Sequence, residues 1–216
     1  MTTSSNLPEL RQPTAREWAS RALGSGLTQP DSRSCGAAVL VFSRMLHDVG
    51  YAQLVASGHH PVTGWTLPGD THERFQSETL AMHRRATRVV TVNERLQLPW
   101  PRALGTPPWA LAAQMSGRHG SGLGGEYVVR PAPMWDRGDI FTDVVKALAA
   151  DHTVPIVVGD RWLPRHVVLG LVGTSDFMRV YDPATGGVRT ITRQEFTDGL
   201  LPFGRWHRCW ATIVPR

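Results

Sequence analysis

The chain changes its hydrophobic pattern along its length, and this change constrains the fold most strongly. Residues 34–48 predict a helix that is apolar almost all round, and a helix of that kind is buried. The last third instead holds short apolar runs rich in β-branched residues, which are typical of strands. These runs cover residues 154–159, 166–172, 177–182, 188–191 and 209–214. Helices first and antiparallel strands later predict an α+β fold.

A Thr or Asp followed three residues later by Glu predicts the start of a helix, because each side chain can bond the other's backbone N–H. This pattern occurs at residues 14–17, 70–73 and 192–195. The first of these opens a helix that we expect to end near residue 23, where glycines follow. Further helices are expected over residues 71–87, 107–115 and 140–151.

A length of 216 residues predicts one domain. Residues 1–13 are polar and contain Pro, so we expect a flexible N-terminus, with a single domain over residues 14–216. Residues 51–135 are rich in Pro, Gly and Trp, and we interpret them as an insertion. Inside it, the glycines of residues 117–125 predict a mobile loop.

Composition excludes several classes of protein. With 41% hydrophobic and 19% charged residues, the chain is globular rather than disordered. No apolar run approaches the ~20 residues of a membrane span, and residues 1–8 lack the apolar centre of a Sec signal peptide. The net charge is +5, but the arginines are scattered, so we expect no nucleic-acid partner. We therefore expect a soluble protein without a membrane partner, cytoplasmic or exported without a Sec signal peptide.

Two cysteines are too few for a disulfide framework, and neither has a nearby Cys partner for zinc. The histidines at 59–60 and 72 lack the spacing of a metal motif, so no metal or other cofactor is expected. Cys209 lies in the last apolar run between two tryptophans, which favours a structural role. Cys35 is the candidate reactive thiol.

Cys35 falls in the first turn of the buried helix, with Ser34 as a candidate N-cap. The positive end of the helix dipole there favours the thiolate form. Gly36 would let a substrate backbone approach closely. Gln29, six residues earlier, can fold back so that its amide joins the Cys35 N–H in an oxyanion hole, although it is also a plausible surface loop residue.

A thiolate needs a base or a cationic partner, and His166 opens one of the predicted strands. Asp182 ends the next strand, and a short turn between the two would place both residues at one end of a hairpin. Asp182 could then bind one imidazole nitrogen and leave the other for Cys35, or it could simply cap the Pro-Gly turn that follows. Trp162, four residues before His166, is expected beside the site, where it would shield the ion pair from water.

The motifs Gln29…Cys35-Gly-Ala-Ala, His166-Val-Val-Leu-Gly and Asp182-Pro-Ala-Thr-Gly resemble those of the papain-like cysteine peptidases. Within these they are most similar to the bacteriocin-leader-processing peptidases fused to ABC exporters and to their stand-alone relatives. The resemblance covers residues 29–50 and 137–191. It implies a papain-like α+β fold, in which a helical half led by the nucleophile helix packs on an antiparallel sheet.

The resemblance also implies roles: Cys35 as nucleophile, His166 as general base, Asp182 as its orienting partner and Gln29 as oxyanion donor. Ser34 departs from the family, whose members often carry an acidic residue there. The implied reaction is acyl transfer from a peptide or protein substrate through a Cys thioester, with no cofactor.

The acceptor in this reaction is left open by the sequence. Water attacking at a peptide bond makes the protein a thiol protease. Water attacking at a glutamine side chain makes it a deamidase, and an amine acceptor makes it a transglutaminase-like enzyme. Each fits a bacterial effector or toxin. The alternative is a papain-like module that binds a protein partner without catalysis.

Overall fold

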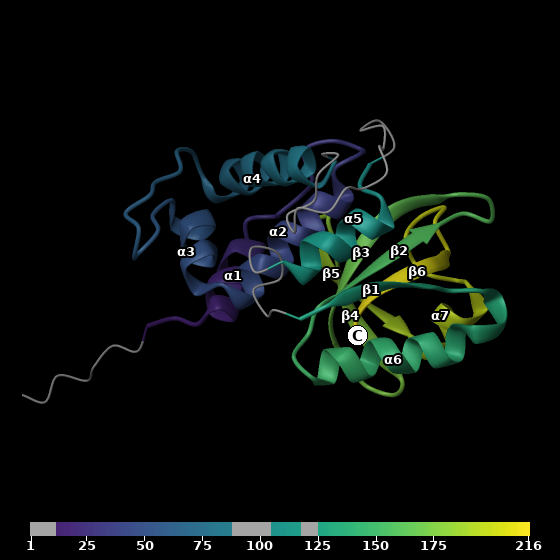
Figure 1. The fold of residues 1–216 in the computed structure, drawn as a ribbon. Helices are drawn as coiled ribbons and strands as arrows, with labels where there is room; N and C mark the ends of the chain where they lie inside the picture. The colour runs from purple at the N-terminus through teal and green to yellow at the C-terminus, as the bar shows by residue number, and fades with distance from the viewer. Residues whose placement is uncertain (1–11, 88–104, 118–124) are drawn as a thin grey trace, which may run out of the picture.

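The computed structural model describes residues 12–87, 105–117 and 125–216 (Figure 1). The first half is helical. It comprises α1 (Ala15–Leu23), α2 (Cys35–His47), α3 (Val49–Ser57), α4 (Thr71–Ala86) and α5 (Pro108–Ser116). The second half alternates strands with two further helices and a 3₁₀ turn. Its elements are β1 (Tyr127–Pro131), η2 (Met134–Asp136), α6 (Arg137–Ala149), β2 (Val154–Gly159), β3 (Pro164–Gly173), β4 (Phe177–Asp182), β5 (Gly187–Thr192), α7 (Arg193–Asp198) and β6 (Arg208–Pro215).

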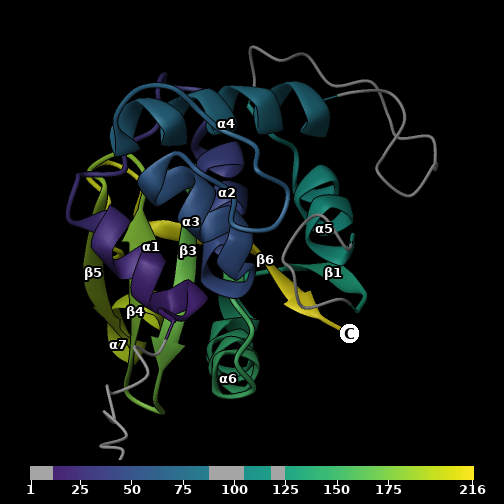
Figure 2. The same cartoon turned by 90° about the vertical axis from the view of Figure 1, so that its left-hand side faces the viewer.

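The six strands form one sheet in the order β1-β6-β2-β3-β4-β5, and every neighbouring pair is antiparallel. Alternate residues of β3 pack into two different hydrophobic clusters, one on each face of the sheet, because successive side chains of a strand point to opposite faces. Val167 and Leu169 pack with α2, whereas Val168 packs with α6. Figures 1 and 2 show α1–α4 gathered to one side of the sheet and α6 on the other. The predicted α+β fold with an antiparallel sheet is confirmed.

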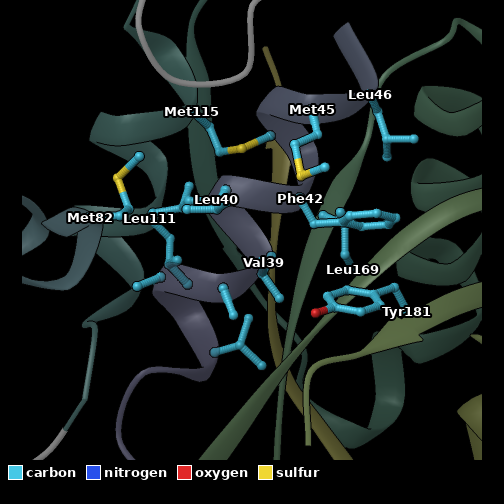
Figure 3. Close-up of a cluster of buried hydrophobic side chains, with 14 of the residues drawn as sticks. Val39, Leu40, Phe42, Met45, Leu46, Met82, Leu111, Met115, Leu169 and Tyr181 are labelled. Carbon is cyan, nitrogen blue, oxygen red and sulfur yellow. The ribbon is translucent and has the colours of Figure 1, made fainter. Parts of the chain in front are cut away.

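Helix α2 forms the centre of the helical half. Phe42 and the residues that precede it are buried on all sides, as the almost continuous apolar pattern predicted. Figure 3 shows what surrounds this helix: Leu111 of α5 and Met82 of α4 on one side, and Tyr181 of the sheet on the other. The Phe42 and Tyr181 rings lie 4.4 Å apart between centroids. Helix α2 is therefore held rigidly against the sheet, which matters for the residue at its N-terminus.

The helix starts predicted from capping boxes are confirmed. Thr14, Asp70 and Thr192 each accept a hydrogen bond from the Glu N–H three residues later, and each Glu side chain bonds back to the cap. Such reciprocal bonds satisfy two backbone donors that the helix leaves unpaired. The signal is contained within four residues, so the sequence alone is enough to find it.

The region interpreted as an insertion contributes to both halves of the molecule. Helix α4 packs on α2, and its buried Arg74 donates hydrogen bonds to the carbonyls of Val55 and Ala56. Strand β1 forms an edge of the sheet beside β6. Of the segments expected to be flexible, residues 1–11 of the N-terminus and residues 118–124 of the glycine-rich loop lie outside the described residues. No helix in the described ranges has the length and apolar character to span a membrane.

Candidate active site

Cys35 is the first residue of α2, and its side chain is buried with 6% of its surface exposed. Ser34 occupies the N-cap position as expected, but its hydroxyl donates to the Asp31 carbonyl at 3.2 Å instead of capping the helix. Among the described residues, no side chain caps the first turn of α2. The backbone N–H groups at this end, which a helix cannot satisfy itself, therefore surround the thiol with a positive potential.

His166 and Asp182 come together across the neighbouring strands β3 and β4. His166 Nε2 lies 2.7 Å from Asp182 Oδ1, and both residues are almost completely buried. Asp182 Oδ1 also accepts the Ala184 N–H at 3.0 Å, so the same carboxylate caps the turn and binds the imidazole. The two interpretations of Asp182 in the sequence are thus compatible.

The pKa values of this pair follow from burial and from the partners of each group. Burial on its own would lower the pKa of His166, but hydrogen bonds with Asp182 and with the Cys35 thiol outweigh it and raise the pKa to about 9. Burial would raise the pKa of Asp182, but the hydrogen bond and charge of His166, together with Ala184 N–H and Arg189, hold it below its usual value. The pair is therefore an imidazolium beside a carboxylate at neutral pH.

The arrangement assigns the two imidazole nitrogens. Since Nε2 is bonded to Asp182, Nδ1 is the ring atom left for Cys35, the second hydrogen-bond partner that raises the pKa of His166. The structure thus brings Cys35, His166 and Asp182 into one cluster at the N-terminus of α2. A thiol, a proton carrier and a carboxylate in this order are the groups that nucleophilic catalysis by cysteine requires.

The aromatic ring over the imidazole belongs to Trp206. It stacks on His166 with the centroids 4.8 Å apart and the planes inclined by 29°. Trp162, predicted to shield this position, is instead 68% exposed, with the Arg161 guanidinium over its ring. That prediction of shielding was wrong, because strand pairing and not distance along the chain decides which ring covers His166. Val158 of β2 pairs with His166 on one side and with Cys209 on the other. Trp206 lies three residues before Cys209, so this pairing brings its ring to the imidazole.

Gln29 lies next to the cluster but is held by other partners. Its backbone N–H donates to the Pro183 carbonyl at 2.8 Å, directly after Asp182. Its side-chain Nε2 donates to the Asp31 carbonyl at 2.5 Å, while Oε1 is buried without a partner among the described residues. One N–H of Nε2 remains for another acceptor. The role of Gln29 as an oxyanion donor stays a prediction.

Gly36 permits a close approach, but the group that approaches it is part of the protein. A Cβ atom at this position would lie 2.8 Å from Thr106 Cβ and 3.2 Å from Leu111 Cδ2. The missing side chain thus lets residues 105–107 and α5 pack against the start of α2. The prediction of a substrate backbone over this face of Gly36 is not supported by this packing.

Cys209 lies within strand β6 and not at the start of a helix. It is 2% exposed, and burial raises its pKa to about 12, which disfavours the thiolate. Both cysteines are free. In the described part of the chain, no three His, Cys, Asp or Glu residues gather as metal ligands would.

A hollow of about 540 Å³ lies beside Trp206, the ring that stacks on His166. It is lined by Asp160, Arg165, Phe203, Gly204, Arg205 and Trp206. Trp206 thus has two neighbours, the imidazole and the open space, so a molecule in the hollow could contact the ring that stacks on the candidate proton carrier. Comparison with protein-family models finds no match to this chain, and comparison with curated proteins finds none either.

Proposed function

We propose that the protein is a papain-like cysteine hydrolase or acyltransferase that acts on a peptide or amide bond, with peptidase as the leading activity. The observation that carries the proposal is the buried imidazole of His166, which is bonded to Asp182 through Nε2 and interacts with the Cys35 thiol. A purely structural histidine does not need both a carboxylate and a thiol at the uncapped N-terminus of a helix.

In the proposed reaction, His166 already holds the proton as an imidazolium, and the Cys35 sulfur attacks the carbonyl carbon as a thiolate. A C–S bond forms, and the imidazolium donates its proton to the amide nitrogen as the C–N bond breaks, so an amine leaves and a thioester remains. Water then attacks the thioester and gives a proton to His166. The C–S bond breaks, and the acid is released with the thiolate and the imidazolium restored.

Groups around the site stabilise the charges that form during the proposed reaction. The Cys35 N–H, at the positive end of α2, can donate to the oxyanion that forms on the carbonyl oxygen, an interaction worth about 3–4 kcal/mol in other enzymes. Trp206 covers one face of the imidazole and keeps water from it. Low exposure of Cys35, His166 and Asp182 strengthens their mutual attraction, since water screens it poorly.

The test is alkylation and acylation of the thiol. We expect iodoacetamide to modify Cys35 well below pH 7, and an activated ester such as acetylglycine p-nitrophenyl ester to release a burst of nitrophenol and add an acyl group to Cys35. Cys35→Ala removes both reactions and His166→Ala removes alkylation at low pH. Cys209→Ala, the matched control at a buried inert thiol, keeps both within about twofold.

Two outcomes would contradict the proposal. If the folded Cys35→Ala and Cys209→Ala variants lose alkylation and acylation equally, the assignment of Cys35 as the nucleophile is wrong. Alkylation of Cys35 that appears only at the alkaline pH of an ordinary thiol, with no acyl-enzyme by mass spectrometry, would favour the non-catalytic binding module.

A further inference from the structure

The hollow beside Trp206 carries positive charge on two arginines. Arg165 and Arg205 are both exposed on its wall, and within the described residues neither makes a hydrogen bond or an ion pair. Two unpaired guanidiniums on one wall of a concave site are the groups that bind a carboxylate most readily.

The acidic group among the described residues of the wall, Asp160, is already engaged. Asp160 Oδ1 accepts the N–H groups of Trp162 and Leu163 at 2.6 and 2.9 Å, which closes the turn between β2 and β3. These two hydrogen bonds lower the pKa of Asp160, and the charges of Arg165 and Arg205 lower it further, so it is ionised at neutral pH. The described lining of the hollow therefore carries two positive charges against one negative charge that is bound to backbone.

The chemistry of the proposed reaction decides which part of a substrate enters this hollow. His166 must reach the leaving nitrogen, so the leaving-amine side of the substrate lies on the imidazole side of Cys35. Trp206 stacks on that imidazole and lines the hollow, and Arg165 precedes His166 in β3. The hollow is thus separated by one aromatic ring from the imidazole that must meet the leaving amine.

We propose that this hollow is a subsite for the leaving amine and that it selects a carboxylate there, through Arg165 and Arg205. The inference rests on the proposed function. The carboxylate is either an acidic side chain that follows the scissile bond or the free carboxyl end of a short leaving peptide. Trp206 supplies the apolar floor on which the carbon chain of either group lies.

Aminolysis of the acyl-enzyme tests this subsite directly. Once the p-nitrophenyl ester has acylated Cys35, an added amine attacks the thioester, a C–N bond forms, the C–S bond breaks and the proton of the amine passes to His166. Since this is the reverse of amide cleavage, the amine occupies the leaving-group subsite. The ratio of amide to acid products measures its binding and does not depend on how fast the enzyme is acylated.

At low ionic strength we expect the glutamic acid α-amide to be acylated about fivefold more often than the glutamine amide, and the lysine amide less often than both. A second comparison, between glycylglycine and its C-terminal amide as acceptors, tests whether the subsite binds a free carboxyl end. A preference in either pair supports the subsite and identifies the source of the carboxylate. Equal product ratios in both pairs overturn the proposal.

Variants connect the preference to the two arginines. The double variant Arg165→Gln/Arg205→Gln should lose the preference, and Arg205→Glu should turn it toward the lysine amide. Arg161→Gln is the matched control, because Arg161 is an exposed arginine of the same turn that lies over the Trp162 ring and does not line the hollow. An equal loss of preference in Arg161→Gln would mean that overall charge and not this subsite selects the amine.

A wild-type protein that forms no acyl-enzyme would contradict the proposed function instead, and the carboxylate site then has its own test. Arginine Nε–H resonances of Arg165 and Arg205, assigned from the Gln variants, are followed by NMR as the glutamic acid amide or the lysine amide is added to Cys35→Ala protein. Saturable shifts with the first amide alone support a carboxylate site, and no shift with either overturns it.

Discussion

The carboxylate of Asp182 is one of the two partners that keep His166 protonated. Asp182→Asn keeps an oxygen that can accept from Nε2 but removes the negative charge, so the pKa of His166 should fall from about 9. We expect a decrease of about 1–2 units in the pH at which the imidazolium loses its proton. The measurement is a titration of the His166 ring nitrogens by NMR.

Asp160→Asn is the control for this titration, because Asp160 is bonded to backbone in the turn after β2. This variant makes the same chemical change at a residue that does not bond the imidazole, so the pH midpoint of the His166 titration should not move. A midpoint that moves equally in both variants, or in neither, would mean that Asp182 does not hold the proton on His166.

Trp206 is the second residue on which the imidazole depends. Trp206→Ala exposes the stacked face of His166 to water and removes an aromatic pair worth about 0.5–1.5 kcal/mol, so acylation of Cys35 should slow about threefold to tenfold. Trp162→Ala removes an exposed ring and should change the rate less than twofold. The nitrophenol burst rate compares the two. A larger effect at Trp162 would reverse the assignment of the shielding ring.

These residues also show what the sequence can and cannot predict. His166 and Asp182 were placed together correctly because one short hairpin relates them, so their spacing contains the geometry. Trp206 was missed because it reaches His166 only when β6 pairs with β2, and no local signal specifies that pairing. The neighbours of Gly36 were missed for the same reason, since Thr106 lies 70 residues away along the chain.

At the scale of elements, the segment before α2 is joined to the turn between β4 and β5. Tyr181 donates its hydroxyl to the Leu27 carbonyl at 2.5 Å, and the Gln29 N–H donates to Pro183. Gly186 completes this contact: its φ is +69°, and a Cβ atom there would lie 2.9 Å from the Gly26 carbonyl carbon. The turn that holds Asp182 and the segment that leads to Cys35 are thus one packed unit.

Gly186→Ala should separate these two elements. The methyl group collides with backbone, so we expect the acylation burst to fall about tenfold or more, with a loss of stability of about 1–3 kcal/mol. Gly64→Ala is the matched control, since Gly64 also has a positive φ, of +71°, but nothing within 4 Å of the added methyl. Denaturant unfolding and the burst are measured for both. A burst as strong in Gly186→Ala as in Gly64→Ala would show that this contact does not position the site.

Element boundaries were predictable where the signal is local and not where it depends on packing. The capping boxes and the β-branched runs identify their own helices and strands within a few residues. The sheet order is different, because β6 lies between β1 and β2 and brings together segments from opposite ends of the second half. This pairing gives the hollow its wall, which explains why the sequence predicted the cluster but not the space beside it.

Over the whole molecule, the buried His166 and the half-buried His47 give opposite dependences of stability on pH. The pKa of His166 is raised to about 9, so the stability it contributes is present below the unfolded value of about 6.5 and is lost as the pH rises through 9. Burial, and then the charge of Arg16, lowers the pKa of His47 to about 4. The unfolded chain then binds the proton first, and stability is lost as the pH falls from 6.5 toward 4.

The free energy of unfolding should therefore be greatest near pH 6–7 and fall on both sides, by at most about 3 kcal/mol for each histidine. Urea unfolding from pH 4 to pH 10 measures this curve. His166→Gln should flatten the alkaline side and leave the acid side, whereas His47→Gln should do the reverse. Because the two residues lie on different elements, the variants should act independently. An alkaline decline that persists unchanged in His166→Gln would mean that the imidazolium–carboxylate pair does not stabilise the fold, and that the cluster is maintained by the packing around it.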